Sequence, residues 1–387
     1  MDYDRKKSYF CDMINRIIIQ RINDTLSLGK AVLLLGPWQV GKTTTLLALK
    51  DNYPGSIYLD CDEPDVRSIL SDTSSSKLRS YLGSNKLVII DEAQRVKNIG
   101  LTLKLITDKL KDIQLIVSGS SALELSADIN EPLTGRKIEM IMSGLSYQEL
   151  CDYHGIIEEK RLLDTRLLYG MYPEVVTHPD RAEILLRELT SGYLYKDVFN
   201  YQDVRKPELL HNLTEALARQ VGSEVSYNEL AQLLASDPAT IGRYIDLMEK
   251  SMVIFRLRSF SRNLRNELKK SRKIYFYDNG IRNAILGDFR PMSLRTDAGI
   301  LWENYMVGER LKMNNNTAYH CMSYFWRTRQ QQEIDYIEDA DGSLHAFEFK
   351  YSKQKSAKFS KSFIDEYHPR QSSVINPENY HDFLTKT

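Results

Sequence analysis

The sequence predicts an α/β protein with a parallel sheet in its N-terminal part, a helical region after it, and a smaller second α/β region. Short apolar runs typical of buried strands occur at 31–35, 57–60, 87–90, 114–118 and 138–142, and stretches of helical character separate them. Strands that alternate with helices pair in parallel and are covered on both faces. The pattern ends near residue 150, so we expect a first domain over 1–150.

Length and composition are those of an ordinary globular protein with several domains. The 387 residues suit two or three domains. The chain is 42% hydrophobic and 27% charged, which excludes a disordered or fibrous protein. Lys plus Arg and Asp plus Glu both number 52, so the net charge gives no general attraction to nucleic acid or membranes. Any such contact must be local.

The cysteines and the N-terminus predict a soluble cytoplasmic protein. No C-x-x-C pair or zinc-finger spacing is present, so we expect reduced thiols. The first residues lack the apolar segment of a signal peptide. The longest apolar runs, such as 31–35, are far shorter than the roughly 20 residues of a membrane span. We therefore expect no membrane partner.

A phosphate-binding loop follows the first strand. The segment Gly36-Pro-Trp-Gln-Val-Gly41-Lys42-Thr43 matches G-x-x-x-x-G-K-[ST] between an apolar strand and a helical stretch. Small residues let backbone N–H groups surround phosphates at a helix N-terminus. Lys42 would reach the β- and γ-phosphates, and the Thr43 hydroxyl would ligate magnesium. The residues predicted to bind ATP with Mg²⁺ are Gly36, Pro37, Trp38, Gln39, Val40, Gly41, Lys42, Thr43 and Thr44.

Two carboxylates follow the apolar run 87–90. Asp91 would hold the magnesium ion, and Glu92 would polarise an attacking water, as in P-loop proteins that hydrolyse ATP. Both stand where a parallel sheet binds its ligands. One β-type run, 57–60, intervenes between the two motifs, which is the order of the additional-strand class. We therefore predict a P-loop NTPase domain with an AAA-like core.

Two further residues complete the predicted catalytic set of Glu92, Lys42, Ser118 and Arg136. Ser118 ends the run 114–118 and would sense the γ-phosphate or the water; the alternative is a serine-rich turn. Arg136 would neutralise transition-state charge in its own chain or in a neighbouring one. The alternative for Arg136 is a surface salt bridge.

The remaining chain divides into three predicted regions. Residues 151–205, including a helix over 182–198, form a helical linker or lid. Residues 206–262 have the pattern of a winged helix-turn-helix, with Ser226 and Asp237 as helix caps and Pro238 in a first turn. Residues 263–387 form a smaller α/β domain in which Asp341-Gly342 marks a hairpin.

With these motifs, the chain resembles a large prokaryotic family of AAA-like ATPases that carry a C-terminal restriction-endonuclease-like domain of uncertain function. The resemblance implies nucleotide chemistry more firmly than any biological role. The segments that carry it are the Walker A and B motifs, Ser118-Gly-Ser-Ser, Leu133-Thr-Gly-Arg136, Gly170-Met-Tyr-Pro173-Glu174, the winged-helix segment, Tyr275-Phe-Tyr-Asp278-Asn-Gly280 and Leu301-Trp-Glu303-Asn304.

A second candidate site lies in the C-terminal region. Asp335 shares one strand face with Glu333, and Glu348 shares the next with Lys350, because side chains two apart point the same way. With Glu303 from a helix, the set is similar to the D…(D/E)-x-K arrangement of metal-dependent nucleases, although Ile334 and not Pro precedes Asp335. The alternatives are a solvated strand face or a nuclease fold that no longer cuts.

A basic segment runs from Arg256 to Lys273. It has eight basic residues and one acid, which suits contacts to nucleic-acid phosphates. Lysines between Lys350 and Lys361 add a second cluster. The alternative is a protein-binding helix-turn-helix with a solvated charged face. The basic residues are Arg256, Arg258, Arg262, Arg265, Lys269, Lys270, Arg272 and Lys273.

The sequence thus favours an ATP-hydrolysing P-loop ATPase coupled to DNA binding or processing by a nuclease-like domain. The competing hypothesis is a signalling or scaffold ATPase whose C-terminal half binds protein and cuts nothing. A processive motor is a third hypothesis, and it requires a homo-oligomeric ring with Arg136 acting on a neighbour.

Overall fold

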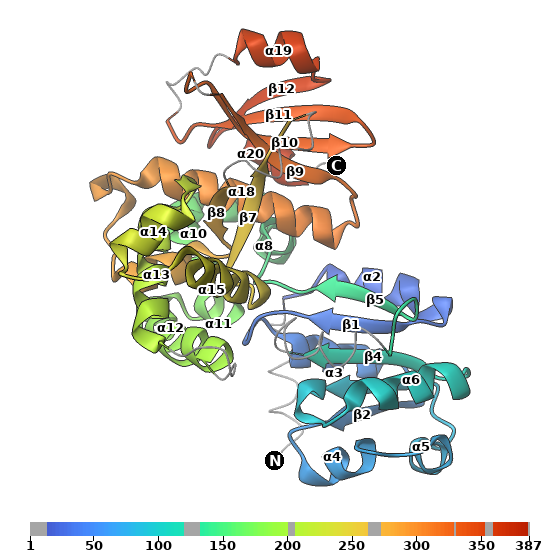
Figure 1. Cartoon of the computed structure of the whole chain (residues 1–387). Helices are drawn as coiled ribbons and strands as arrows, with labels where there is room; N and C mark the ends of the chain where they lie inside the picture. The colour runs from blue at the N-terminus through green and yellow to red at the C-terminus, as the bar shows by residue number, and fades with distance from the viewer. Residues whose placement is uncertain are drawn as a thin grey trace.

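A computed structural model of the chain describes residues 14–119, 132–199, 206–261, 272–328, 330–352 and 359–385, with side chains left out for 193–199. Figure 1 shows two sheets, one formed by the N-terminal part and one that joins the middle and the C-terminal parts.

The first sheet has five parallel strands in the order β2-β3-β4-β1-β5. The strands are β1 (Ala31–Leu35), β2 (Ser56–Asp60), β3 (Leu87–Asp91), β4 (Gln114–Gly119) and β5 (Lys137–Ile141). All five predicted apolar runs are therefore strands, and the prediction of a parallel α/β domain is confirmed. The order places β1, which leads into the phosphate loop, between β4 and β5.

Helices cover both faces of this sheet because alternate strand residues are apolar on each side. On one face, Val32 and Leu34 pack in the same cluster as α2 (Ile18–Thr25) and α3 (Lys42–Asn52). On the other face, Leu33 packs in the same cluster as α4 (Pro64–Leu70), α5 (Ser75–Leu82) and α6 (Ile99–Lys109). The three inner strands β3, β4 and β1 are buried on both sides, which holds their carboxyl ends in place.

A helical region follows, as predicted. The helix predicted over 182–198 lies within α12. The helices are α8 (Tyr147–His154), α9 (Ile156–Arg161), α10 (Leu163–Tyr169), α11 (Pro173–Thr177) and α12 (Ala182–Phe199).

The described residues 206–261 and 272–276 form helix, strand, helix, helix, strand, strand. The elements are α13 (Pro207–Arg219), β6 (Glu224–Val225), α14 (Tyr227–Leu233), α15 (Pro238–Lys250), β7 (Ile254–Ser259) and β8 (Arg272–Phe276). The predicted caps are present: Ser226 accepts a hydrogen bond from the Glu229 amide, and Asp237 accepts one from the Thr240 amide. Whether this unit acts as a DNA-binding winged helix stays a prediction.

The C-terminal part adds four strands to the same second sheet, whose order is β12-β11-β10-β9-β7-β8-β6. The hairpin between β10 and β11 turns at Asp341 and Gly342, both with positive φ, as predicted. The elements are α17 (Asn279–Leu286), α18 (Ala298–Asn316), β9 (Met322–Arg327), β10 (Glu333–Ala340), β11 (Ser343–Phe349), α19 (Lys361–Tyr367), β12 (Gln371–Ile375) and α20 (Tyr380–Thr385).

The second sheet crosses the boundary that the sequence suggested at 262/263. β7 pairs antiparallel with β8 and parallel with β9, through Arg258–Tyr324 and Ser259–Phe325. The boundary would separate the paired strands β7 and β8, so the winged region and the C-terminal region are one structural unit. A parallel contact between strands more than 60 residues apart leaves no local trace in the sequence.

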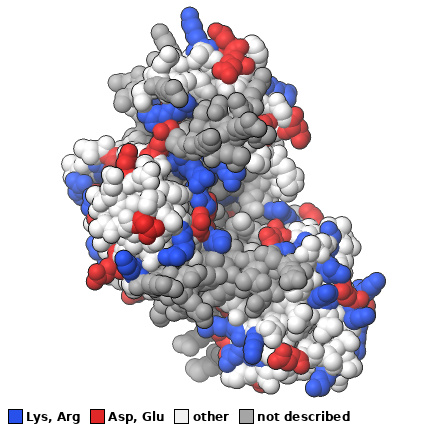
Figure 2. All heavy atoms as spheres, in the orientation of Figure 1, with Lys and Arg blue, Asp and Glu red and all other residues white. Residues whose placement is uncertain are grey.

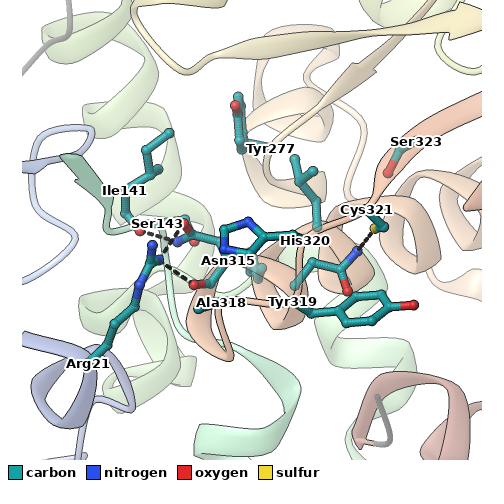
Figure 3. A pocket seen from close by; sticks show the side chains of 13 residues that line it. Arg21, Ile141, Ser143, Tyr277, Asn315, Ala318, Tyr319, His320, Cys321 and Ser323 are labelled. Atoms are coloured by element: carbon teal, nitrogen blue, oxygen red, sulfur yellow. Dashed lines mark hydrogen bonds between the residues drawn. The ribbon is translucent and has the colours of Figure 1, made fainter. Parts of the chain in front are cut away.

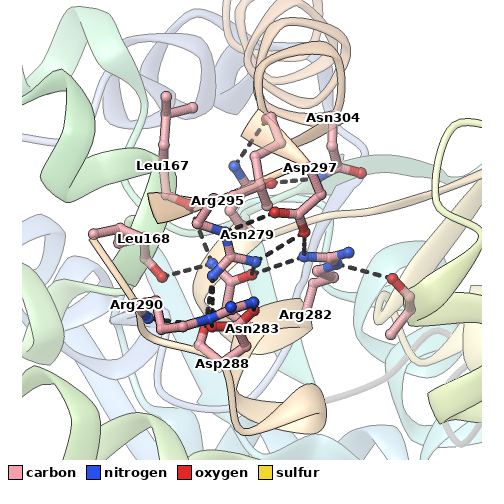
Figure 4. A network of polar contacts seen from close by, with 12 residues as sticks. Leu167, Leu168, Asn279, Arg282, Asn283, Asp288, Arg290, Arg295, Asp297 and Asn304 are labelled. Atoms are coloured by element: carbon pink, nitrogen blue, oxygen red, sulfur yellow. Dashed lines mark hydrogen bonds and ion pairs between the residues drawn. The ribbon is translucent and has the colours of Figure 1, made fainter. Parts of the chain in front are cut away.

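A buried polar network holds this unit together and joins it to α10 of the helical region (Figure 4). Asn283, which is fully buried, donates to the carbonyls of Leu167 and Leu168 on α10. Asn304 on α18 bonds both the amide and the carbonyl of Phe276. Gly280 lies so close to α10 that an added Cβ would be 2.2 Å from the Tyr169 carbonyl oxygen. Phe276, Gly280 and Asn304 belong to the segments that carry the resemblance, and their visible role is packing.

Hydrogen bonds of Asn315 help attach α18 to the N-terminal part (Figure 3). Arg21 of α2 donates to the backbone oxygen of Asn315 at 2.6 Å, and the Asn315 side chain donates to the Ile141 carbonyl at the end of β5. A pocket of about 300 Å³ lies beside them, lined also by Ser143 and His320. In the described residues, no helix is both long and apolar enough to cross a membrane.

Candidate active site

The phosphate loop runs from the end of β1 to the start of α3. Gly36 packs against the backbone that directly follows β5, because an added Cβ would stand 2.0 Å from the Met142 carbonyl oxygen. Gly41 has φ +91°, a conformation that favours glycine, and it directly precedes α3. Both glycines of the motif are thus required by the backbone. Trp38 is 45% exposed on the outside of the loop, and Val40 is buried.

Lys42 is inside the loop. Its side chain is only 4% exposed, and its Nζ donates to the carbonyls of Gly36 at 2.9 Å and Pro37 at 2.8 Å. The ammonium therefore lies at the opening of the phosphate loop, called its mouth below, next to the N-terminus of α3. A positive charge at that position suits the phosphates of a nucleotide.

Asp91 is the best-connected side chain of the site. Its Oδ2 accepts hydrogen bonds from Thr43 Oγ1 at 2.7 Å and from Tyr58 OH at 2.6 Å. Its Oδ1 accepts from the Glu92 amide at 3.1 Å and from the hydroxyl of Ser118. Asp91 is 2% exposed. The structure thus brings the two predicted magnesium ligands, Thr43 and Asp91, into direct contact although 48 positions separate them.

Glu92 stands at the carboxyl end of β3 in the left-handed backbone region, with φ +52°. A non-glycine residue in this region costs of order 1 kcal/mol or more and persists only where the surroundings impose it. Its carboxylate accepts from the Gln94 side chain. Burial raises the pKa of Glu92, while the charge of Lys42 and the bond from Gln94 act against that rise. Such a carboxylate is more basic than an exposed one.

These donors fit magnesium and a nucleotide. Mg²⁺ prefers hard oxygen ligands and is held by few protein groups together with phosphates. Thr43 and Asp91 supply a hydroxyl and a carboxylate at the mouth of a loop whose Gly36 leaves no room for a side chain. Lys42 faces the same mouth through its bonds to the loop carbonyls.

Ser118 lies near the end of its strand, as expected, and Arg136 forms the salt bridge that was the alternative interpretation for it. Ser118 is fully buried, and its hydroxyl donates to Asp91, so it braces that carboxylate. Arg136 precedes Lys137, which pairs with Ala31 at the start of β1, whereas the phosphate loop follows the end of that strand. Arg136 therefore lies at the amino ends of the strands, opposite the phosphate loop, where it pairs with Asp108 at 2.6 Å. It is not part of its own chain's nucleotide site.

Sequence reasoning missed Tyr58 and Arg16. Tyr58 is two residues before the end of β2, and strand alternation gives its face but not its partner. Arg16 donates to the Val40 carbonyl in the phosphate loop at 2.6 Å and to the Ser143 carbonyl at 2.7 Å. It also pairs with the buried Glu149 at 3.0 Å. No motif marks an arginine that binds backbone carbonyls.

A pocket of about 970 Å³ opens beside the loop on the side of Arg16. It lies between the chain before α2, helix α3 and helix α11, and it is lined by Asn15, Thr44, Ala48 and Glu174 among others. Pockets of this size hold small-molecule cofactors. Thr44, predicted from the motif alone, therefore faces a space beyond the phosphate position.

The second predicted cluster is also assembled. Tyr336 pairs with Phe347 between β10 and β11, which puts Asp335 opposite Glu348. Lys350 Nζ is 2.7 Å from Glu348 Oε2 and 3.4 Å from Asp335 Oδ2. Burial and the charge of Asp335 raise the pKa of Glu348 to about 7, against the effect of Lys350. Three of the four predicted residues therefore meet directly.

Glu303 reaches the same cluster through a lysine that the sequence analysis assigned to DNA. Lys273 of β8 is 2% exposed and pairs with Glu303 at 3.1 Å and with Glu333. Tyr275 OH donates to Glu303 at 2.7 Å. Burial lowers the pKa of Lys273, but the charges of Glu303, Glu333 and Asp335 together raise it above its usual value. Its ammonium neutralises the carboxylates that would otherwise face a metal ion.

In the described parts of the chain, no group of three or more His, Cys, Asp or Glu side chains is arranged to hold a metal ion. The carboxylates of the C-terminal cluster are joined by the ammonium groups of Lys273 and Lys350. The nuclease-like residues thus converge as predicted, with two lysines between the acids.

Two basic residues of the predicted DNA-binding segment are engaged within the protein. Lys273 is buried, and Arg256 pairs with Asp246 and Glu249 of α15. Arg258 is exposed, and Arg272 lies over the Tyr227 ring. On the face in Figure 2, basic and acidic side chains are interspersed. The other four basic residues lie outside the described residues: Arg262, Arg265, Lys269 and Lys270.

Three family models match successive parts of the chain. Residues 28–151 match an AAA domain. Residues 160–291 and 298–386 match two domains of unknown function, DUF8612 and DUF4143. The two latter matches share the seven-stranded sheet, because β7 and β8 fall in one and β9 to β12 in the other.

The chain is also similar to individual proteins. An uncharacterized protein of Mycobacterium tuberculosis is 26% identical over 341 residues, which cover 87% of this chain and 74% of that protein. An uncharacterized protein of Methanocaldococcus jannaschii is 23% identical, over 83% of this chain and 75% of that one. A solved Walker-type ATPase of Pyrococcus abyssi has a TM-score of 0.48 and 16% identity, over 71% of this chain and 96% of that one. By its family match, its motifs and its five-stranded parallel sheet, the part of the chain from 28 to 151 is an AAA-like P-loop ATPase domain.

Proposed function

We propose that the protein binds ATP with Mg²⁺ at the phosphate loop and hydrolyses it. The observation that carries this proposal is the hydrogen bond between Thr43 and Asp91 at the carboxyl edge of the parallel sheet, with the Lys42 ammonium at the same loop mouth. A hydroxyl, a carboxylate and an ammonium in this arrangement serve phosphoryl transfer.

Each residue has a distinct part. The N-terminus of α3 and Lys42 bind and orient the phosphates. Thr43 and Asp91 would hold Mg²⁺, which offsets charge on the phosphate oxygens when it is bound. Ser118 keeps the Asp91 carboxylate in place from the neighbouring strand. The pocket lined by Asn15 and Thr44 would take the nucleoside.

Glu92 would orient and polarise the attacking water. It follows Asp91 directly, at a left-handed backbone position just after the end of β3. Burial raises its pKa, which brings the carboxylate closer to the basicity that proton acceptance requires near neutral pH. The Gln94 side chain holds one of its oxygens.

Two variants test this assignment. Lys42→Ala should lose about 10²-fold or more in phosphate release, because a charged phosphate contact is removed. Glu92→Gln should bind ATP as tightly as the wild type while turnover falls about 10²- to 10⁴-fold. Lys50→Ala, at the far end of the same helix, is the matched control and should turn over normally. Normal turnover in Lys42→Ala would contradict the assignment of the phosphate loop as the ATP site. Loss of ATP binding in Glu92→Gln would show that Glu92 has a structural role.

Action on DNA is a second candidate function, favoured by one observation: Asp335, Glu348 and Lys350 meet as the nuclease-like pattern requires. Lys273 opposes it by occupying the adjacent carboxylates. The test is cleavage of single- and double-stranded DNA with Mg²⁺ or Mn²⁺, with and without ATP, in the wild type and Asp335→Ala. Cleavage lost in the variant establishes a nuclease.

If neither protein cuts, the C-terminal unit is a binding platform, and the signalling or scaffold hypothesis leads. ATPase rates with added DNA then separate DNA from protein partners, since only DNA binding predicts stimulation that fades with salt. A role for Arg136 on a neighbouring copy requires an oligomer, which mass measurement with and without ATP detects.

A further inference from the structure

The carboxylate of Asp91 has no acceptor position left. A carboxylate offers about four lone-pair positions, two on each oxygen. Thr43 and Tyr58 donate to Oδ2, and Ser118 and the Glu92 amide donate to Oδ1. A hydrated magnesium ion that approaches Asp91 needs one of these positions, so one protein donor must leave.

Three of the four donors are poor candidates to leave. The Glu92 amide belongs to the residue next to Asp91 and donates to both Asp91 Oδ1 and Ser118 Oγ, at 3.1 and 3.2 Å, so two acceptors hold it on the Oδ1 side of the carboxylate. Ser118 is fully buried on β4, so its hydroxyl would lose its bond without reaching water. Thr43 is the other magnesium ligand; its oxygen can face the metal while its proton stays on Asp91.

Tyr58 differs from them. It extends from β2, the edge strand of the sheet, and is only partly buried. The tyrosine hydroxyl lies far from the backbone, so a small side-chain rotation moves it away from Asp91. It can then bond water instead of the carboxylate at small net cost, because both groups are hydrogen-bonded before and after the exchange. Its 2.6 Å bond to Oδ2 is on the same oxygen that Thr43 contacts.

We propose that Tyr58 is the donor that gives way: its hydroxyl holds the acceptor position on Asp91 that a hydrated magnesium ion takes when nucleotide binds. Tyr58 thereby sets how much magnesium the site requires. The inference rests on the proposed ATP site and adds to it a residue that no motif includes.

The test is the magnesium dependence of nucleotide binding by the full chain. The probe is the methylanthraniloyl derivative of the non-hydrolysable ATP analogue AMP-PNP, titrated with Mg²⁺ from EDTA. In Tyr58→Phe the half-saturating Mg²⁺ concentration should fall about threefold to tenfold, because a hydrogen bond to a charged group is no longer broken. Affinity in EDTA should not change.

Tyr53→Phe is the matched control. Tyr53 is also partly buried, and its hydroxyl bonds Asn23 at 3.0 Å, outside the nucleotide site. It should keep the wild-type magnesium dependence, and equal unfolding midpoints exclude a folding effect. An unchanged half-saturation in Tyr58→Phe overturns the inference, and a raised one would mean that Tyr58 orients Asp91 for the metal. If wild type and Lys42→Ala bind the probe alike, the proposed ATP site itself fails.

Discussion

Removing the buried ammonium of Lys273 tests whether the C-terminal cluster is a structural charge network. Lys273→Met keeps most of the side-chain volume but leaves Glu303, Glu333 and Asp335 without the group that neutralises them. Breaking a buried ion pair from one side costs about 3–5 kcal/mol. Glu303 and Glu333 keep 19% and 29% exposure, so the lower end of that range applies.

Urea unfolding followed by tryptophan fluorescence measures this loss. Trp302 and Trp326 are both buried in the C-terminal unit, whereas Trp38 is exposed, so the signal follows that unit. With a urea slope of about 3 kcal/mol per molar, a loss of about 3 kcal/mol lowers the midpoint by about 1 M. Lys86→Met breaks an exposed pair with Asp112 in the N-terminal part and should leave the midpoint of this signal close to the wild-type value.

The pH dependence of the stability lost in Lys273→Met tests the same explanation. Burial raises the pKa of Glu303, and Lys273 opposes that rise, so the variant raises it further. A carboxyl whose folded pKa is raised contributes stability that is fully present below its unfolded pKa and lost as pH rises through the folded value. The defect of Lys273→Met should therefore shrink on acidification. A midpoint equal to that of Lys86→Met, or a defect independent of pH, would refute the reasoning.

Two further predictions concern Glu348 and Gly36. Because the pKa of Glu348 is about 7 in the folded chain, the stability of the C-terminal unit should fall as pH rises from about 5 to about 8, and urea midpoints should show this fall flattened in Glu348→Gln. Gly36→Ala should abolish binding of the fluorescent nucleotide and cost about 1–3 kcal/mol, since its Cβ would overlap the Met142 carbonyl. Gly299→Ala, which meets no atom within 4 Å, should bind normally, and an equal loss in both variants would contradict the steric explanation.

The sequence predicted the nucleotide half of the molecule well because its signals are local. An apolar strand, a glycine loop and a helix start follow one another at 31–52, and the carboxylates stand at a strand end. Parallel strands bring those ends to one edge whatever lies between them. The contact of Thr43 with Asp91 follows from this rule.

The remaining features depend on distant partners. The basic run ending at Lys273 suggested phosphate contacts because a sequence counts charges without showing which acids they meet; the fold turns Lys273 into the carboxylate cluster and Arg256 onto α15. Ser118 lies at the expected strand end, yet its hydroxyl meets Asp91. For Arg136 the sequence left two roles open, and its partner Asp108, which lies 28 positions away, decides for the salt bridge.

The seven-stranded sheet has a practical consequence for dividing the chain. A cut between 291 and 298, where two family matches end and begin, would separate β7 and β8 from β9 to β12. Each fragment would carry a strand whose backbone groups had lost their partners, and such open edges pair with other chains. Expression of either piece alone should give aggregates, so work on the C-terminal chemistry requires both pieces in one polypeptide.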